Sequence, residues 1–353
     1  MIDIIIPAYN AHSTIDRCLA SILMQVEPDL RVTIVNDAGK DYKETIERYK
    51  DVLNIREIGY EDNRGPGEAR QYGYDHTDGE YVTFIDADDT FYTPFALKAL
   101  RMGIEMDGGY VACIGEFTEE NNGNFLPHQQ DMVWMFGKLY RRKFIDKYKI
   151  RFCPGSRWNE DNGWNTCLRL CTNEYEKINF IPDTVYCWHE QLNSITRIEN
   201  CRYSYDKSFV GFAENMIWAV KHGYKVAPFN GMIDQWAIMS LLNLYEYLLE
   251  AYGRDRRFLR QAWAWTQAYF DHIIMPIQNK LNNDVLLAIY SDVMRNAYGR
   301  GSMEGIIPFM SLKEFFVKLT KHEELEYEED DISDYFPSDS KWLSNDKEET
   351  LKF

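Results

Sequence analysis

The stretch Tyr81-Val82-Thr83-Phe84-Ile85-Asp86-Ala87-Asp88-Asp89 decides the fold of this chain. Its first five residues are β-branched or aromatic, which is typical of a buried strand. Three carboxylates follow within four positions, and because an apolar core cannot host that charge, the strand must end at an exposed rim. Asp86 and Asp88 are two apart, a spacing that lets two carboxylates converge on one hard cation. The alternative is a loop in which Asp89 caps a helix that begins near Pro94.

Two strands expected earlier in the chain also end in polar residues. The apolar strand 2–6 leads towards Tyr9-Asn10, and the strand 31–35 leads into Asn36-Asp37. Strands separated by helices indicate βαβ units and a parallel sheet, whose carboxyl ends share one rim where ligands bind. We therefore expect these polar clusters to meet the rim at Asp86. The predicted helices cover residues 13–25 (with Ser13 as cap), 41–50, 68–75 and 94–106.

The sequence predicts an α/β fold, with a Rossmann-like, mostly parallel sheet flanked by helices and a mainly α-helical C-terminal region. At 353 residues the chain has room for two domains. Beyond Gly115 we expect a polar loop at 121–130 and strands at 177–181 and 184–188, and after Asn200 every periodic segment is helical. The expected units are a domain at 1–200, a helical domain for acceptor binding or oligomerisation at 201–322, and an acidic, flexible tail at 323–353.

Charge and hydropathy restrict the partners of the protein. The net charge is −17, and residues 323–353 hold twelve acidic and three basic side chains. Such a surface disfavours nucleic acid and anionic membranes. No segment reaches about 18 uncharged apolar residues, so we expect no integral membrane contact and a cytoplasmic protein. The seven cysteines form no Cys-x-x-Cys pair, which indicates reduced thiols and neither zinc nor disulfides.

Seven short segments of the chain form an ordered series over about 200 residues. They are Ile4-Ile5-Ile6-Pro7-Ala8-Tyr9-Asn10, Val35-Asn36-Asp37-Ala38-Gly39, Asn63-x-Gly65 with Ala69-Arg70-x-x-Gly73, Phe84-Ile85-Asp86-Ala87-Asp88-Asp89, Gly137-Lys138-Leu139-Tyr140-Arg141, Glu160-Asp161, and Trp188-His189 to Ser194-Ile195-Thr196. In this order they resemble the family 2 glycosyltransferases of the GT-A fold. Each segment alone is a weak match, whereas the series is specific. The resemblance does not extend beyond Asn200.

The resemblance implies transfer of a sugar from a UDP-sugar donor to an acceptor hydroxyl, with inversion at the anomeric carbon. In such an enzyme Pro7-Ala8-Tyr9 would line the nucleobase pocket and Asp37 would accept the uracil N3–H. Arg70 would help to fix the base or the diphosphate. Asp86 and Ala87 are further candidates for binding the nucleotide-sugar.

The resemblance also implies a divalent ion, Mn²⁺ or Mg²⁺. Asp88 would be the direct metal ligand that bridges to the diphosphate, and Asp86 would bind the ribose or a metal-bound water. His189 would be a further metal or diphosphate ligand, with Gln191 as the alternative if the alignment slips. A divalent ion suits this reaction because the departing diphosphate develops negative charge that the ion stabilises without proton transfer.

A carboxylate base is the last part that the resemblance implies. Asp161 would deprotonate the acceptor hydroxyl, with Glu160 beside it as the second catalytic candidate. Glu160, Trp158 and Trp164 could raise the pKa of Asp161 through like charge and partial desolvation. Because tryptophan faces stack on sugar rings, this segment is also expected to meet the acceptor or the transferred sugar.

Each of these residues also has an ordinary structural explanation. Asp37 fits as a cap of the next helix, Arg70 as a surface helix residue in an ion pair, and His189 as a structural histidine after a strand. The two adjacent carboxylates suit any helix start, because the helix dipole favours negative charge there. Helix packing explains the aromatic residues of 203–269, with acceptor binding as the alternative.

Two other functions remain open from the sequence: a catalytically silent nucleotide-sugar-binding or scaffold protein, and a nucleotidyltransferase. The complete set of carboxylates argues against the first. The second normally carries a Gly-rich, basic phosphate loop after the first strand, where this chain has Pro7-Ala8-Tyr9-Asn10. Two residues depart from the family pattern: Asn36 stands where Asp is frequent, and Gln71 where Asn is frequent. The acceptor stays open among polysaccharide, teichoic-type polymer, protein, lipid carrier and modified nucleobase.

Overall fold

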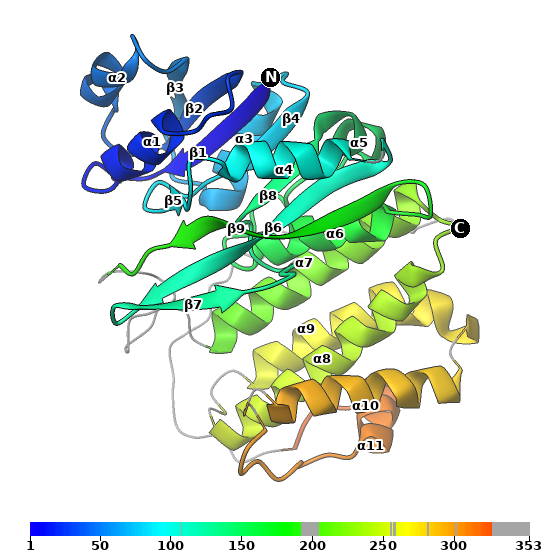
Figure 1. The fold of residues 1–353 in the computed structure, drawn as a ribbon. Coiled ribbons are helices and arrows are strands. Elements are labelled where there is room, and N and C mark those ends of the chain that lie inside the picture. The colour runs from blue at the N-terminus through cyan, green and yellow to red at the C-terminus, as the bar shows by residue number, and fades with distance from the viewer. Residues whose placement is uncertain are drawn as a thin grey trace.

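The computed structural model describes residues 1–106, 108–191, 205–254, 256, 259–280, 282–299, 301 and 303–326. Its N-terminal part alternates strands and helices as the sequence predicts (Figure 1). The elements are β1 (Ile2–Ala8), α1 (Ile15–Leu23), β2 (Leu30–Asp37), α2 (Lys43–Tyr49), β3 (Ile55–Tyr60), α3 (Pro66–Asp75) and β4 (Tyr81–Phe84). The N-cap of α1 is Thr14 and not Ser13, and its side chain makes no capping hydrogen bond. Pro66 occupies the start of α3, where its fixed φ suits the first helical turn.

The second part of the sheet differs from the prediction in two places. Residues 121–130 are not a loop, because they contain a strand that pairs antiparallel with the end of β6. The two strands expected at 177–181 and 184–188 are one strand, whose register against β6 shifts around Pro182. The elements are β5 (Thr90–Phe91), α4 (Ala96–Glu105), β6 (Tyr110–Asn121), β7 (Asn124–His128), β8 (Lys138–Arg141), α5 (Arg142–Tyr148), α6 (Glu160–Cys171) and β9 (Lys177–Trp188).

These strands form one nine-stranded mixed sheet in the order β3-β2-β1-β4-β8-β6-β9-β5, with β7 paired to β6. The four strands β3, β2, β1 and β4 are parallel and form the Rossmann-like part. Strand β8 then runs antiparallel to both β4 and β6, and β9 is parallel to β6. The predicted α/β fold with helices on the sheet is confirmed, and the parallel character is concentrated in its first half.

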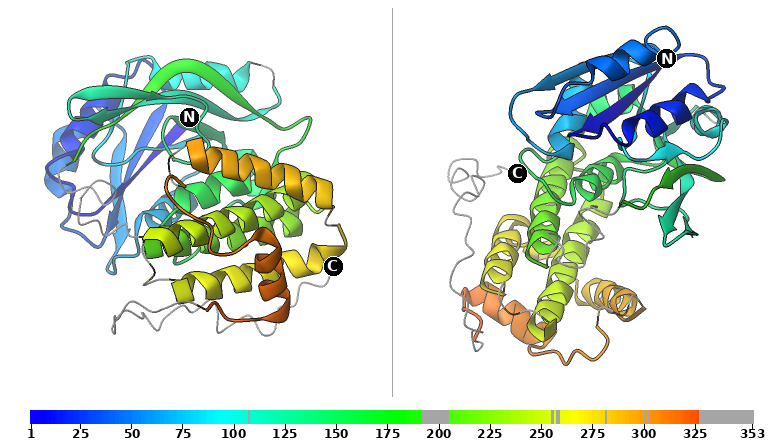
Figure 2. Two further views of the ribbon diagram at one scale, coloured as in Figure 1. Left: turned by 90° about the horizontal axis from the view of Figure 1, so that it is seen from below. Right: turned by 90° about the vertical axis from the view of Figure 1, so that its left-hand side faces the viewer.

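Alternating side chains of the strands build a separate core on each face of the sheet. Ile4 and Ile6 of β1 pack with buried residues of α1 and α4, whereas Ile5 packs with buried residues of α3, α5 and α6. Because successive side chains of a strand point to opposite faces, one strand serves both cores. The resulting three layers leave the carboxyl ends of the parallel strands at the edge of the sheet (Figures 1 and 2).

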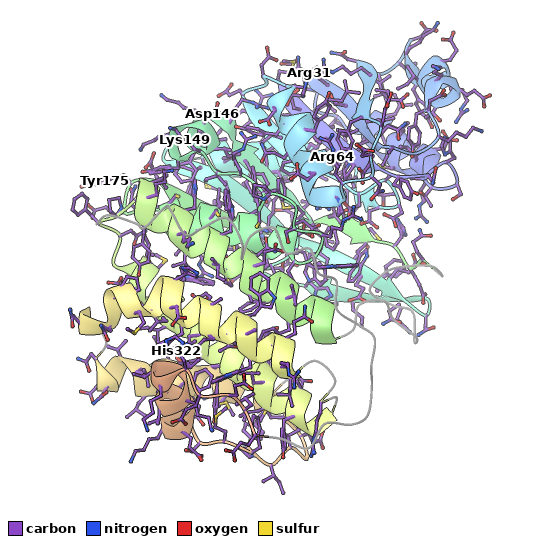
Figure 3. All side chains as sticks on the ribbon, turned by 180° about the vertical axis from the view of Figure 1, so that it is seen from behind. Arg31, Arg64, Asp146, Lys149, Tyr175 and His322 are labelled. Carbon is purple, nitrogen blue, oxygen red and sulfur yellow. The ribbon has the colours of Figure 1, made fainter. Side chains whose placement is uncertain are left out.

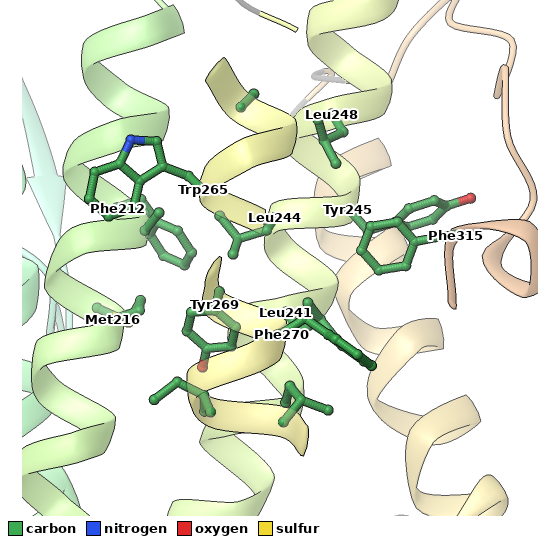
Figure 4. Close-up of a cluster of buried hydrophobic side chains, with 14 of the residues drawn as sticks. Phe212, Met216, Leu241, Leu244, Tyr245, Leu248, Trp265, Tyr269, Phe270 and Phe315 are labelled. Atoms are coloured by element: carbon green, nitrogen blue, oxygen red, sulfur yellow. The ribbon is translucent and has the colours of Figure 1, made fainter. Parts of the chain in front are cut away.

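The C-terminal region is helical, as predicted, and lies on the far side of α6 from the sheet (Figures 1 and 2). Its aromatic residues, including Tyr245, Trp265 and Tyr269, fill a third core, so helix packing accounts for them (Figure 4). The elements are α7 (Tyr205–Val226), α8 (Met232–Arg254), α9 (Leu259–Tyr269), a π-helix (Phe270–Ile274), a 3₁₀-helix (Met275–Lys280), α10 (Asn283–Gly299) and α11 (Leu312–Lys321). The predicted flexible tail falls almost entirely on residues 327–353, which lie outside the described residues.

Helix α7 packs along α6 and thereby joins the helical region to the sheet. A Cβ added to Gly163 of α6 would lie 2.2 Å from Oδ1 of Asn215 in α7, so the two helices approach as closely as glycine allows. The Asn215 amide donates to Oγ of Ser156 at 2.9 Å and to the carbonyl of Trp158 at 2.8 Å. The segment that precedes α6 is therefore held by α7, and the division of the chain at residue 200 stays a prediction.

Two further expectations concern the whole described chain. None of its helices has both the length and the apolar character needed to cross a bilayer. The six cysteines within the described residues are free and buried, in agreement with the prediction of reduced thiols.

Candidate active site

Strand pairing brings the ends of β1, β2 and β4 to one edge of the sheet. At the end of β1, Pro7 is half-buried, Ala8 is buried and Tyr9 has 56% of its surface exposed. Asp37 is the last residue of β2, and one residue, Ile85, separates Asp86 from the end of β4. Of these residues, Tyr9 offers the largest accessible surface to a ligand.

Asp37 is tied to the loop that begins α3. Its Oδ1 accepts a hydrogen bond from the backbone N–H of Arg64 at 2.7 Å, and its Oδ2 accepts one from the N–H of Gly65 at 2.9 Å. Gly65 has φ +92°, a conformation that side-chain-bearing residues rarely adopt. Asp37 therefore does not cap α2, the next helix, and instead fixes the turn that aims α3 at the site. The Arg64 side chain stands beside this turn (Figure 3).

Arg70 of α3 is buried beneath the rim and binds three carboxylates. Its Nη2 donates to Oδ1 of Asp86 at 2.7 Å, and its Nη1 donates to Oε1 of Glu160 at 2.9 Å and to Oδ1 of Asp161 at 2.7 Å. Burial alone would lower the pKa of Arg70, but the three carboxylates outweigh it and hold that pKa well above its usual value. The interpretation of Arg70 as a surface ion-pair residue is wrong, since only 2% of it is exposed.

Glu160 and Asp161 begin α6, after Asn159 turns the chain in the left-handed region at φ 56°. Both carboxylates are buried. Burial and the neighbouring Asp161 raise the pKa of Glu160 to about 8, against the opposing charge of Arg70. The pKa of Asp161 is also raised, mainly by burial and further by Asp86, although Arg70 acts in the opposite sense. The expected rise in the pKa of Asp161 is present, but the like charge that adds to burial is Asp86.

The two tryptophans that flank these carboxylates do not form a sugar platform together. Trp164 is fully buried in the core between the sheet and α6, where its ring stacks on Phe152. Trp158 packs against Gly211 of α7 and is half-buried. The expectation that Trp164 meets a sugar is therefore wrong. Its helical spacing to Leu168 and Cys171 places it on the buried face of α6.

Three carboxylates of the rim cluster closely enough to hold a metal ion. Asp86, Asp88 and Asp89 each offer an oxygen, and these oxygens lie within 4.8 Å of one another. Asp89 is buried, and it accepts hydrogen bonds from the Tyr186 hydroxyl at 2.7 Å and from the backbone N–H of His189 at 2.8 Å. Burial, Asp88 and Asp86 raise its pKa well above the usual range. The expectation that Asp89 caps a helix is wrong, because α4 begins at Ala96.

His189 lies beside the acidic cluster with both ring nitrogens engaged. Its Nε2 is 2.9 Å from Oγ1 of Thr90, and its Nδ1 is 2.8 Å from Oε2 of Glu120. Burial lowers the pKa of His189, although Glu120 acts in the opposite sense. His189 would have to release one of these partners to bind a metal. Gln191, the alternative ligand, is half-buried two residues further along.

The structure thus joins some of the predicted residues directly and keeps others apart. Asp86, Arg70, Glu160 and Asp161 form one hydrogen-bonded cluster. Asp37 binds the turn that precedes α3, the helix that carries Arg70. His189 is joined to the rim by the hydrogen bond from its backbone N–H to Asp89. The candidate site therefore consists of three parts. They are an acidic rim with two partly exposed carboxylates, Asp86 and Asp88, the exposed aromatic ring of Tyr9, and the buried carboxylates Glu160 and Asp161.

Two functional candidates escaped the sequence analysis. Tyr186 of β9 accepts a hydrogen bond from the N–H of Asp86 at 3.2 Å and donates to Asp89, so it orders the acidic loop. Lys138 of β8 is fully buried near Asp161. Lysine is normally exposed, and its neighbours Gly137 and Leu139 do not indicate burial. No sequence signal connects Tyr186 with residues 100 positions away.

The parallel part of the sheet, the acidic rim at its edge and the C-terminal helical region are the arrangement of a GT-A-type glycosyltransferase. Comparison of the sequence with protein families matches residues 3–158 to Glycosyl transferase family 2. Residues 3–158 therefore match a family 2 glycosyltransferase domain, and the remainder of the chain lies outside this match.

Three curated relatives match 56–59% of the chain. It is 26% identical to the uncharacterized glycosyltransferase EpsJ of Bacillus subtilis over 56% of its own length, and 26% identical to the uncharacterized glycosyltransferase YibD of Escherichia coli over 59%. Glycosyltransferase GlyA of Streptococcus pneumoniae is 24% identical over 56% of the chain. The matches span 63%, 68% and 32% of these three proteins, respectively.

Among solved structures, S. aureus TarS 1–349 in complex with UDP-GlcNAc resembles the chain with a TM-score of 0.61 at 19% identity. The superposition covers 85% of this chain and 92% of that one, so the likeness of fold extends beyond the family match into the helical region.

Proposed function

We propose that the protein is an inverting, metal-dependent glycosyltransferase that moves a sugar from a UDP-sugar to an acceptor hydroxyl. One observation carries this proposal: Arg70 binds Asp86 on the accessible rim and Asp161 in the buried pair at the same time. This arrangement supports a donor site on one side of a single guanidinium and a base on the other. The family match and the TarS complex with UDP-GlcNAc support the choice of donor class.

The donor would lie across the ends of β1 and β2. The exposed ring of Tyr9 offers a stacking face for the base, with Pro7 and Ala8 as the floor of the pocket. Asp37 keeps acceptor capacity for a base N–H, because a carboxylate has about four lone-pair sites and the two backbone N–H groups fill two. Ala87, between Asp86 and Asp88, is 5% exposed and packs in the hydrophobic core, so its role in donor binding stays a prediction.

The acidic rim fits a divalent ion such as Mn²⁺ or Mg²⁺. Such an ion prefers oxygen ligands and would stabilise the charge of the departing diphosphate. Asp88 and Asp86 would hold it, since both are partly exposed. Asp89 keeps its bonds to Tyr186 and to the His189 backbone and would shape the loop. His189 stays a candidate ligand, subject to release of Thr90 or Glu120.

Asp161 is the proposed base. As the acceptor oxygen forms its bond to the anomeric carbon, the bond from that carbon to the diphosphate oxygen breaks, and UDP leaves with the bonding electrons. The proton of the acceptor hydroxyl passes to Asp161. Burial suits this role, because a carboxylate with a raised pKa takes up a proton more readily than an exposed one. Arg70 orients the carboxylate, and Glu160 shares that guanidinium.

Donor hydrolysis tests this function without knowledge of the acceptor. Purified protein is incubated with UDP-, GDP- and dTDP-sugars in the presence of Mn²⁺, Mg²⁺ or EDTA, and the release of free nucleotide is measured. We expect slow release of UDP from one or two UDP-sugars, abolished by EDTA. Absence of nucleotide binding under every condition would refute the proposal, and binding of UDP-sugar without any turnover with acceptor libraries would favour the silent binding protein.

A further inference from the structure

Lys138 is a buried charge that the proposed reaction does not use. Its side chain is 0% exposed at the start of β8. The ammonium donates to the carbonyl oxygens of Trp134 at 2.6 Å and Phe136 at 3.2 Å, and it lies 3.7 Å from Oδ1 of Asp131. A buried ammonium is unfavourable unless hydrogen bonds compensate it. Lys138 obtains that compensation from a single turn, residues 131–137, whose shape it fixes in return.

That turn carries one of the contacts of the proposed base. Between the two carbonyls that Lys138 holds lies the backbone N–H of Met135, which donates to Oδ2 of Asp161 at 3.2 Å. The Asn165 amide holds the same turn from α6, donating to the Trp134 carbonyl at 3.0 Å. Asp161 is therefore fixed through one oxygen by Arg70 and through the other by a turn that Lys138 supports.

Lys138 also acts on Asp161 through its charge. Burial raises the pKa of Asp161, whereas the positive charges of Arg70 and Lys138 act in the opposite sense. Because a general base must be ionised before it can accept a proton, these two cations keep the buried carboxylate competent. The charged groups that face Lys138 are Asp131 from the turn and Asp161 from α6.

We propose that Lys138 is a positioning residue for the general base, which holds the Trp134–Phe136 turn against Asp161. Because its side chain is fully buried, we expect it to contact neither donor nor acceptor. This inference rests on the proposed role of Asp161 in transfer.

The proposal has a consequence for the pH profile. Burial lowers the pKa of Lys138 to about 8, although Asp131 and Asp161 raise it. The ammonium therefore loses its proton in an accessible pH range, and kcat is expected to fall as the pH rises through about 8. Glu160 also titrates near this value. The variant Glu160→Gln removes that second group, and the alkaline fall in kcat is expected to persist in it.

The first test is the Lys138→Met variant, which removes the charge and the hydrogen bonds at similar length. We expect kcat for transfer to fall about 100-fold, as for a small misplacement of a catalytic group. The KM for the donor is expected to stay unchanged, because Lys138 lies away from the nucleotide. The acid limb of kcat against pH is expected to move to higher pH, since loss of a nearby cation raises the pKa of Asp161.

Two further variants test the role of Lys138 even if Lys138→Met fails to fold. In Lys138→Arg the alkaline fall is expected to disappear, because a guanidinium keeps its proton in proteins. In Asp131→Asn it is expected to move to lower pH, because Asp131 raises the pKa of Lys138. An unchanged alkaline limb in both variants, or wild-type kcat in a folded Lys138→Met protein, overturns the inference.

The variant Asp161→Asn separates failure of this inference from failure of the proposed function. If Asp161→Asn is inactive while the Lys138 variants behave as wild type, only the role of Lys138 is refuted. If Asp161→Asn turns over normally, the assignment of the base is refuted, and the role of Lys138 falls with it.

Discussion

Arg70 and Asp161 are 91 positions apart in the sequence and are joined by a hydrogen bond of 2.7 Å between Nη1 and Oδ1. The same nitrogen reaches Glu160, and the other terminal nitrogen reaches Asp86. One buried guanidinium therefore connects α3, the acidic loop after β4 and the start of α6. The orientation of the proposed base depends on α3, the helix that also borders the proposed donor pocket.

The first prediction concerns the stability that Arg70 provides. The Arg70→Met variant leaves three carboxylates without their shared cation, two of them buried, so we expect the free energy of unfolding to fall by about 3–5 kcal/mol. Denaturation with urea measures it. The matched control is Arg48→Met, which removes a pair with Asp16 in which both side chains are half-exposed. That change is expected to lower stability by about 0–1 kcal/mol. Equal losses in the two variants would contradict the buried network.

The second prediction concerns Asp161. In Asp161→Asn the new amide cannot accept from both Arg70 and the Met135 N–H, and it cannot take up the acceptor proton. We expect binding of UDP-sugar, measured by calorimetry, within a few-fold of wild type and transfer reduced about 10³-fold. The exposed Asp51→Asn serves as control and is expected to transfer normally. Normal transfer by Asp161→Asn would remove this residue from its role.

The third prediction is a dependence of stability on pH. The folded protein holds the pKa of Glu160 at about 8, above the value of an unfolded chain, so folding takes up a proton between about pH 4.5 and 8. The stabilisation is complete below the unfolded pKa and is lost as the pH rises through the folded pKa. Glu160 alone contributes a slope of up to about −1.4 kcal/mol per pH unit in this window.

The variant Glu160→Gln tests this linkage directly. Stability is measured by guanidinium denaturation at several values between pH 5 and 8, and the slope of the variant is expected to be shallower than that of wild type. Asp161 contributes with the same sign in both proteins, because its pKa is also raised. Parallel slopes would show that Glu160 is ionised throughout the range.

The fourth prediction concerns the metal. Asp88→Asn removes the proposed direct ligand, and we expect the affinity for Mn²⁺ in the presence of UDP to fall about 100-fold or more, beyond the loss typical of an outer-shell partner. Calorimetric titration with Mn²⁺ measures this affinity. Asp78→Asn, an exposed carboxylate paired with Arg31, is the control and should bind Mn²⁺ and UDP as wild type does. Undiminished Mn²⁺ affinity in Asp88→Asn would place the metal elsewhere.

The fifth prediction concerns the contact between α6 and α7. A methyl group at Gly163 would lie 2.2 Å from Oδ1 of Asn215, whose amide is held by three hydrogen bonds. We expect Gly163→Ala to lower stability by about 1–3 kcal/mol and to reduce kcat, because α6 begins with the carboxylates proposed for catalysis. Gly231→Ala adds a methyl group into open space and is expected to be neutral. Thermal unfolding and transfer assays on both variants check this.

The sequence alone was enough to predict the alternation of strands and helices from β1 to β4 and the acidic rim after Phe84. Those predictions rest on local patterns, apolar runs that end in carboxylates. Strand β7 was missed because an exposed strand has no apolar alternation. The segment that holds Trp164 was expected to meet a sugar, although the spacing of Trp164 to Leu168 indicates a buried helix face.

The bridging role of Arg70 and the burial of Lys138 could not be read from the sequence. Their partners lie far away in the chain or are backbone atoms: Asp161 is 91 residues from Arg70, and the Trp134 carbonyl holds Lys138. Local patterns carry no information about such contacts. The sequence indicated which residues could do the chemistry, but the hydrogen bonds that orient them follow from tertiary packing.

The hydrogen bonds from Asn215 to the segment before α6 limit how hybrid proteins can be built from this chain and its relatives. Any crossover between residues 71 and 161 separates Arg70 from Asp161, and any crossover between 159 and 214 separates Asn215 from the Trp158 carbonyl. A hybrid joined anywhere from 71 to 214 would therefore take the two partners of at least one of these hydrogen bonds from different parents. Grafting of a foreign C-terminal half would therefore require co-transfer of matched residues from both sides of the junction.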